Sequence, residues 1–220
     1  MDFTGPEAAD LQDVRSLNAA FLDYLRGTPG APLRAAMPAA LRAAVAGLTD
    51  RQIERLAEAP FLLLSLRESD DAYWGRMLAE VPSGDLFAPA SAAPLRAIAA
   101  ATLGFLWQLA RRNPYATRLV SGASLSWCER LADCTLLRLQ RFADRDGLVG
   151  PRFPGDAGFW HRLLGAGLSS ERNVRRAAQL CALQATLAIA STAGAQRFRS
   201  AACHSTLPLL ELRGQTGTRR

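Results

Sequence analysis

The sequence contains no lysine, only two histidines and only four cysteines among its 220 residues. All 26 basic side chains are therefore arginines, and each can make paired hydrogen bonds to a carboxylate or a phosphate. The scarcity of histidine leaves few candidates for acid–base catalysis. The cysteines form no CxxC pair, so we expect reduced, buried thiols and no metal at Cys128, Cys134, Cys181 and Cys203. A metal site built from these cysteines and the two histidines is the less favoured alternative.

Catalytic signatures are also absent from the sequence. The chain has no GxSxG, no glycine-rich phosphate loop, no HExxH and no paired carboxylates at metal-ligand spacing. Asp70 and Asp71 are adjacent, but an acidic pair at the start of a predicted helix is typical of a helix cap. We therefore predict that the protein is not an enzyme and that it uses no cofactor.

No apolar run is long enough to cross a membrane. The longest, residues 97–110, is followed at once by Arg111 and Arg112. The first ten residues are acidic and lack the basic start and apolar core of a signal peptide. We expect a soluble, cytoplasmic protein without membrane insertion.

The residues that are abundant, leucine, alanine and arginine, favour helices, and β-branched residues are few. Apolar periodicity and caps predict an all-α protein with no strand. The predicted helices are Pro6–Arg26, Leu33–Ala46, Thr49–Ala57, Phe61–Leu66, a segment carrying Tyr73–Leu78, Leu95–Arg112, a short helix capped by Ser126 and ending near Asp133, Thr135–Ala143, Trp160–Leu164 and a long helix from Ser169 to about Ala195. A short apolar segment, Leu207–Leu212, and a polar tail follow.

The sequence resembles itself at an offset of 86 residues. Residues 45–78 align without a gap with residues 131–164, and nine of the 34 positions are identical. Trp74 coincides with Trp160, and Thr49 with Thr135. A repeat of this length predicts one helical unit used twice around a shared core, with both tryptophans buried. Chance similarity between two segments rich in alanine, leucine and arginine is the alternative.

The repeat and the composition together predict the organisation of the chain. Residues 1–80 form the first helical repeat, residues 81–94 a linker rich in proline and serine, and residues 95–166 the second repeat. Residues 167–220 form a basic C-terminal helix and tail. The predicted fold is thus all-α, with two similar multi-helix repeats and a long C-terminal helix.

The first repeat resembles the FlhD family of flagellar regulators. The similarity runs from residue 17 to residue 71, about a quarter of the chain, and a weaker second copy spans residues 103–157. It is carried by Leu17-Asn18, Phe21-Leu22, Gly47-Leu48-Thr49, Gln52, Leu56-Ala57-Glu58, Leu62, Arg67 and Asp70-Asp71. The second copy keeps Thr135, Ala143 and Asp156 of this set. The family also has a long helix, a second helix and a short capped helix in this order.

The resemblance implies a bacterial DNA-binding transcriptional activator that acts with a partner, FlhC, and is not an enzyme. The cysteine zinc site of that partner is not recognisable in this sequence. The chain is also longer than a typical family member, so the resemblance describes a duplicated or extended unit.

The charge is uneven along the chain and predicts an anionic partner for its C-terminal part. Residues 1–80 carry a net charge of −4, residues 81–160 of +3 and residues 161–220 of +7. The alternative is that the acidic N-terminal part and the basic C-terminal part of the chain attract one another. On the long C-terminal helix we predict a packed stripe of Val174, Ala177, Ala178, Cys181, Ala185 and Ala188. Beside it, the predicted nucleic-acid or anion site comprises Arg172, Asn173, Arg175, Arg176 and Gln179.

Together with the resemblance to the FlhD family, these features lead us to expect a transcriptional regulator or regulator-like protein that acts through protein contacts, with DNA binding left open. We expect a protein partner or a homo-oligomer, with DNA as a further candidate partner. The alternative is a helical adaptor, chaperone or secretion or flagellar accessory protein that binds no nucleic acid.

Overall fold

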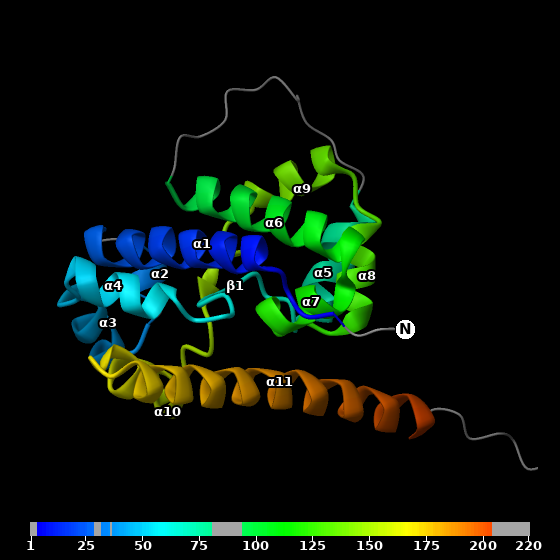
Figure 1. Ribbon diagram of the computed structural model, residues 1–220. Helices are drawn as coiled ribbons and strands as arrows, with labels where there is room; N and C mark the ends of the chain where they lie inside the picture. Colours follow the sequence, from blue (N-terminus) through cyan, green and yellow to red (C-terminus); the bar gives the residue numbers. More distant parts are fainter. Residues whose placement is uncertain (1–3, 29–31, 36, 81–93, 204–220) are drawn as a thin grey trace, which may run out of the picture.

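The structure, a computed structural model, describes residues 4–28, 32–35, 37–80 and 94–203 (Figure 1). It is built of helices with one two-stranded antiparallel sheet, and the predicted all-α class is confirmed. The first half contains α1 (Ala8–Gly27), α2 (Pro32–Ala35), α3 (Ala39–Ala46), α4 (Asp50–Ala57), β1 (Leu64–Ser65) and α5 (Asp71–Ala79). The second half contains α6 (Pro94–Arg112), α7 (Pro114–Ser121), α8 (Leu125–Ala132), α9 (Leu136–Ala143), β2 (Gly150–Pro151), α10 (Ala157–Leu164), the 3₁₀ turn η1 (Ala166–Leu168) and α11 (Arg172–Cys203). No helix in these ranges has the length and apolar character needed to cross a bilayer.

The same local structures recur 86 residues apart. Helices α3 and α8, helices α4 and α9, and strands β1 and β2 begin and end at equivalent positions. The side chain of Thr49 caps α4 and that of Thr135 caps α9. Asp70 and Asp156 cap α5 and α10 in the same way. Helices α1 and α6 also start at equivalent residues, but they bury different faces: Leu22 is buried, whereas its equivalent on α6 is exposed.

Both repeated tryptophans are buried, as predicted. Trp74 and Trp160 are each 2% exposed. The indole Nε1 of Trp74 donates to the carbonyl oxygen of Leu66 at 3.1 Å, and that of Trp160 donates to the carbonyl oxygen of Arg152 at 2.7 Å. Leu66 and Arg152 are themselves 86 residues apart. Each indole is therefore fixed by a backbone acceptor eight residues earlier in the chain.

Helices α5 and α10, which occupy equivalent positions in the two halves, each pack against the other half. Helix α5 of the first half packs Trp74 against Trp127 and Phe142 of the second half. Helix α10 of the second half packs against α3 of the first. Strand β1 pairs with β2 in the antiparallel sense, with Leu64 opposite Pro151 and Ser65 opposite Gly150. Gly150 is the repeat equivalent of Leu64, and Pro151 is that of Ser65. The pairing is therefore reciprocal, as in a two-fold arrangement. The two halves consequently share one hydrophobic core.

The predicted helix over Phe61–Leu66 is wrong, and so is the expectation that the chain has no strand. This segment is extended and contributes β1. Its backbone is held by distant groups: the amide side chain of Asn18 donates to the Phe61 carbonyl at 2.9 Å and accepts from the Leu63 amide at 2.7 Å. A short, fully apolar run has the same appearance in a buried strand and in a buried helix, so these nonlocal bonds decide its conformation.

Other helix boundaries also differ from prediction. The predicted helix Leu33–Ala46 is two helices, α2 and α3, with Pro38 as the N-cap of α3. Helix α8 begins two residues earlier than predicted, because Ser124 caps it in place of Ser126. The structure adds α7, which sequence reasoning missed although Asn113-Pro114 is a cap followed by a first-turn proline. Residues 81–93 of the predicted linker, Leu207–Leu212 and the polar tail lie outside the described residues.

Gly122 lets α11 lie close to the end of α7. It adopts φ 67°, and a Cβ at this position would collide with the methyl group of Thr186 and with the guanidinium of Arg152. We expect Gly122→Ala to lower the free energy of unfolding by about 1–3 kcal/mol, through strained backbone and overpacking. Urea denaturation measures the loss. Gly147→Ala is the control, because Gly147 has φ 71° but open space around its Cβ, so only the backbone strain remains. Equal losses in the two variants would contradict the close approach of α11.

Candidate functional site

The first candidate site is the sequence-predicted cluster at the start of α11. Arg172, Asn173 and Arg176 are exposed. Gln179 is buried, with 9% of its surface exposed, and therefore cannot reach an external base edge or phosphate. The structure thus leaves three of the five predicted residues on the surface and places Gln179 in the interior.

Arg175 has an internal role. Its Nη1 donates to the carbonyl oxygens of Ser169 and Ser170, each at 3.0 Å, and its Nη2 lies 3.7 Å from a carboxylate oxygen of Glu58, the residue that follows α4. These bonds hold the start of α11 against the first half of the chain. Arg175 therefore contributes to the predicted attraction between the acidic N-terminal and basic C-terminal parts and not to an external anion site.

The predicted packed stripe of α11 is wrong by a rotation of the helix. Of the predicted stripe, Ala178 is buried as expected, but Val174, Ala177 and Cys181 are exposed, and further buried residues are Gln179, Ala182 and Thr186. Small residues occur on every side of this helix, so the sequence shows no clear division between an apolar face and a polar face. The buried face could therefore not be predicted from the sequence. The choice is made by the neighbours, since η1 and α10 contact α11 and Thr186 meets Gly122.

The exposed side of α11 combines positive charge with apolar surface. Arg172, Arg176 and Leu180 follow one another at spacings of four, which places them in a row along the helix. Leu180 is 47% exposed and Val174 is 38% exposed. We call Arg172, Arg176 and Leu180 the α11 row. Figure 1 shows α11 lying along one side of the other helices and continuing beyond them.

The helix start adds little to anion binding at this point. Glu171 immediately precedes α11, and its backbone carbonyl accepts the first helical hydrogen bond from Arg175. The exposed carboxylate of Glu171 lies where the positive end of the helix would otherwise attract an anion. The positive charge offered to a partner therefore comes from the two guanidinium groups of the α11 row.

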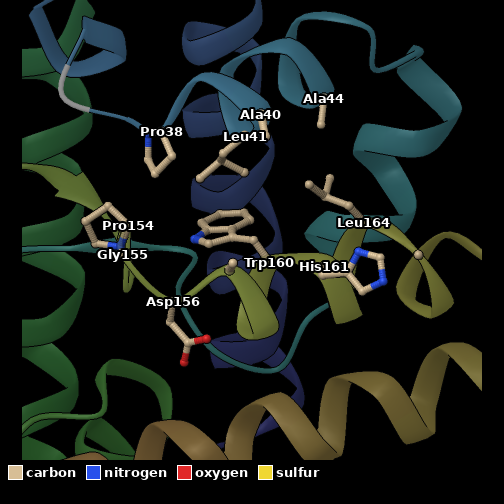
Figure 2. A pocket seen from close by; sticks show the side chains of 12 residues that line it. Pro38, Ala40, Leu41, Ala44, Pro154, Gly155, Asp156, Trp160, His161 and Leu164 are labelled. Atoms are coloured by element: carbon tan, nitrogen blue, oxygen red, sulfur yellow. The ribbon is translucent and has the colours of Figure 1, made fainter.

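The second candidate site is a pocket of about 510 Å³ between α3 and α10 (Figure 2). Its apolar lining includes Pro38, Leu41, Ala44, Ala157, Trp160 and Leu164. Figure 2 shows the indole of Trp160 in the middle of the lining with Leu41 beside it and His161 and Leu164 to one side. The volume and the apolar character are those of small-molecule sites.

The polar lining of the pocket comes from the ends of α10. Asp156 caps α10 by accepting from the Phe159 amide at 2.9 Å, and His161 carries an exposed imidazole. The Trp160 indole is held by its bond to the Arg152 carbonyl, so the floor of the pocket is fixed. The mostly apolar lining with a few polar groups is typical of a binding site.

The equivalent place in the other half holds larger side chains. At the offset of 86, Leu41 corresponds to Trp127, Ala44 to Arg130, and Ala157 to Asp71. The Trp127 ring lies edge-on to Trp74, with centroids 5.2 Å apart and planes at 87°. Arg130 and Asp71 form an ion pair of 2.7 Å across the same gap. Three smaller residues therefore line the pocket at the positions where a tryptophan and an ion pair stand in its counterpart.

Sequence reasoning missed this pocket because it used the identities between the repeats and not the differences. Leu41 and Ala44 lie just before the aligned segment that begins at residue 45, and the substitution of Asp71 by Ala157 lies inside it. Positions where one copy carries a large side chain and the other a small one were the available signal.

The cysteines offer no reactive centre in the described interior. Cys128 and Cys134 are buried as predicted, and burial raises the pKa of the Cys128 thiol to about 12. Cys181 is exposed on α11, which corrects its predicted burial. Within the residues that the structure describes, no three histidine, cysteine or acidic side chains gather as a metal site would require.

The chain was compared with known proteins in three ways. No family model matches the chain, and no curated protein and no solved structure matches it.

Proposed function

We propose that the protein is a regulator of the FlhD type that acts by binding another protein through the α11 row. The observation that carries this proposal is the alternation of charge and apolar surface along Arg172, Arg176 and Leu180, on a helix that continues beyond the body of the fold. The proposal also rests on the resemblance of residues 17–71 to a family that works with a protein partner.

The partner that fits this surface is an acidic protein with an apolar groove. The two guanidinium groups suit carboxylates, and the net charge of +7 over residues 161–220 attracts an acidic surface from a distance. Leu180 contributes binding energy only if it enters an apolar environment, which a protein groove provides and a phosphate backbone does not. This mixture favours protein over DNA as the main partner.

Reversing the charge of the row is expected to abolish partner binding without affecting the fold. Both arginines are exposed, so the double variant Arg172→Glu/Arg176→Glu should change the free energy of unfolding by no more than about 0.5 kcal/mol. The control is Arg15→Glu/Arg51→Glu, which changes the net charge equally at exposed positions of α1 and α4. We expect binding to be lost in the first variant and retained in the second.

The measurement is site-specific photo-crosslinking in a bacterial cell that produces the full chain, with the photoreactive side chain at position 180. The expected result is an adduct with one acidic protein whose purified form binds the parent and the control with an affinity that falls as salt rises. An adduct that persists in the charge-reversed variant would contradict the proposal.

Titration with duplex DNA at several salt concentrations provides the second arm. Strong binding with a steep salt dependence that disappears in Arg172→Glu/Arg176→Glu would replace the protein partner by DNA as the ligand of the row. If the chain binds neither DNA nor an acidic protein, the α11 row is not a binding surface, and the proposed function is wrong.

A further inference from the structure

We propose that the pocket between α3 and α10 binds a small, neutral, planar aromatic molecule of about the size of indole. This inference goes beyond the proposed function and does not depend on it, because none of the pocket residues belongs to the α11 row. It is carried by the shape of the pocket and by what occupies the equivalent place in the other half of the chain.

The chain itself shows which group fits beside the repeated tryptophan. In the second half, the aromatic ring next to Trp74 belongs to Trp127 and meets it edge-on at 5.2 Å. In the pocket, Leu41 stands at the position of Trp127, and Trp160 takes the place of Trp74. Because Trp160 is 2% exposed, a ligand in the pocket reaches only a small edge of its ring, and an aromatic ligand there would make a weaker form of the edge-on pairing of Trp127 with Trp74.

The size and entrance of the pocket also favour a free ligand. About 510 Å³ exceeds the volume of one aromatic side chain and falls within the range of small-molecule sites. In the counterpart, Arg130 and Asp71 form an ion pair, whereas Ala44 and Ala157 occupy those positions at the pocket. The pocket therefore has no such ion pair at its edge, and both of these alanines are exposed.

The lining determines the charge of the ligand. Among the residues that the structure describes, Asp156 and His161 are the ionisable ones that line it, and no arginine does. An anionic ligand would find no guanidinium among these residues. A cationic ligand would lose its hydration against mostly apolar walls, and the carboxylate of Asp156 already accepts from the Phe159 amide as the cap of α10. A neutral ring whose polar atom points toward the exposed imidazole of His161 meets both conditions.

The test uses indole and the full chain. Amide and indole ¹H–¹⁵N spectra are recorded as indole is added to millimolar concentrations. We expect the Trp160 Nε1 signal and the amides of α3 and α10 to shift and saturate, while the Trp127 Nε1 signal stays in place. Cyclohexanol serves as a non-aromatic probe of similar size and should bind at least tenfold more weakly.

Two variants fill the pocket from different sides. Leu41→Trp copies the residue of the counterpart, and Ala44→Phe places a ring at the entrance from an exposed position that tolerates a larger side chain. Both should weaken indole binding at least tenfold. Ala43→Phe is the matched control, because Ala43 is an exposed neighbour on α3 that does not line the pocket, and it should bind like the parent.

The reciprocal exchange tests the comparison between the halves. Trp127→Leu with Arg130→Ala opens the counterpart, and a second indole site next to Trp74 is expected in this variant if it folds. The proposal is overturned if indole shifts no pocket signal in the parent at millimolar concentration, or if Ala44→Phe binds indole as the parent does. Neither result would bear on the α11 row, whose variants leave the pocket intact.

Discussion

Glu68→Ala is expected to lower the free energy of unfolding by about 3–5 kcal/mol, because it leaves a buried arginine without its counter-charge. The side chains of Glu68 and Arg152 are 8% and 3% exposed, and Arg152 Nη1 lies 3.0 Å from Glu68 Oε1. Burial lowers the pKa of Arg152, and the carboxylate of Glu68 opposes that effect. A buried charge that has lost its partner costs far more than the pair contributes when it is intact.

The remaining hydrogen bonds of this pair explain why neither residue can turn away. Arg152 Nε donates to the Leu62 carbonyl at 2.6 Å, and Nη2 donates to the Leu64 carbonyl at 3.0 Å. Glu68 Oε2 accepts from the Leu66 amide at 2.8 Å and from Ser65 Oγ at 2.8 Å. The pair thus joins β2 in the second half to the whole extended segment that carries β1. Its loss should loosen the contact between the halves as well as the local turn.

Urea denaturation of Glu68→Ala, Arg152→Met and the double variant measures this coupling. The double variant should lose less than the sum of the single variants, because it leaves no unpaired buried charge. The control is Asp50→Ala, which breaks the exposed pair of Asp50 with Arg26 and should cost less than about 1 kcal/mol. A loss below about 1 kcal/mol in Glu68→Ala would mean that water reaches Arg152 in solution.

Helix starts could be predicted from the sequence because they depend on a few neighbouring residues. Thr49 and Gln52 have capping-box spacing, and the structure shows both of their reciprocal hydrogen bonds. Asp70 caps α5 as one of the two expected aspartates. These features are local, so no knowledge of the rest of the fold was needed.

The conformation of the segment after α4 could not be predicted because distant groups decide it. Leu62 donates its amide to the Val120 carbonyl, and Arg152 donates its amide to the Leu63 carbonyl. Neither partner is near in sequence. The same holds for the candidate sites, since the packed face of α11 depends on Gly122 and on Glu58, and the pocket depends on α10 crossing to the first half.

Truncating the two repeated tryptophans is expected to destabilise the protein unequally, by about 3–5 kcal/mol for Trp74→Ala and by less for Trp160→Ala. Both indoles are equally buried and both donate to a backbone carbonyl, so these contributions cancel in the comparison. Trp74 also makes edge-on contacts with Trp127 and Phe142, at centroid distances of 5.2 and 5.8 Å. Each such pair adds about 0.5–1.5 kcal/mol, whereas Trp160 borders the pocket on the corresponding side.

Urea denaturation of the two variants, with Trp74→Phe and Trp160→Phe beside them, separates the causes. The phenylalanine variants remove the indole hydrogen bond in both halves and should lose similar amounts. The alanine variants should differ by about the value of the aromatic contacts, roughly 1–3 kcal/mol for the two pairs at Trp74. Introducing Leu41→Trp should reduce this difference, because it supplies Trp160 with the neighbour that Trp74 already has. Equal losses in Trp74→Ala and Trp160→Ala, unchanged by Leu41→Trp, would show that the space beside Trp160 is closed in solution and that the pocket is not available to a ligand.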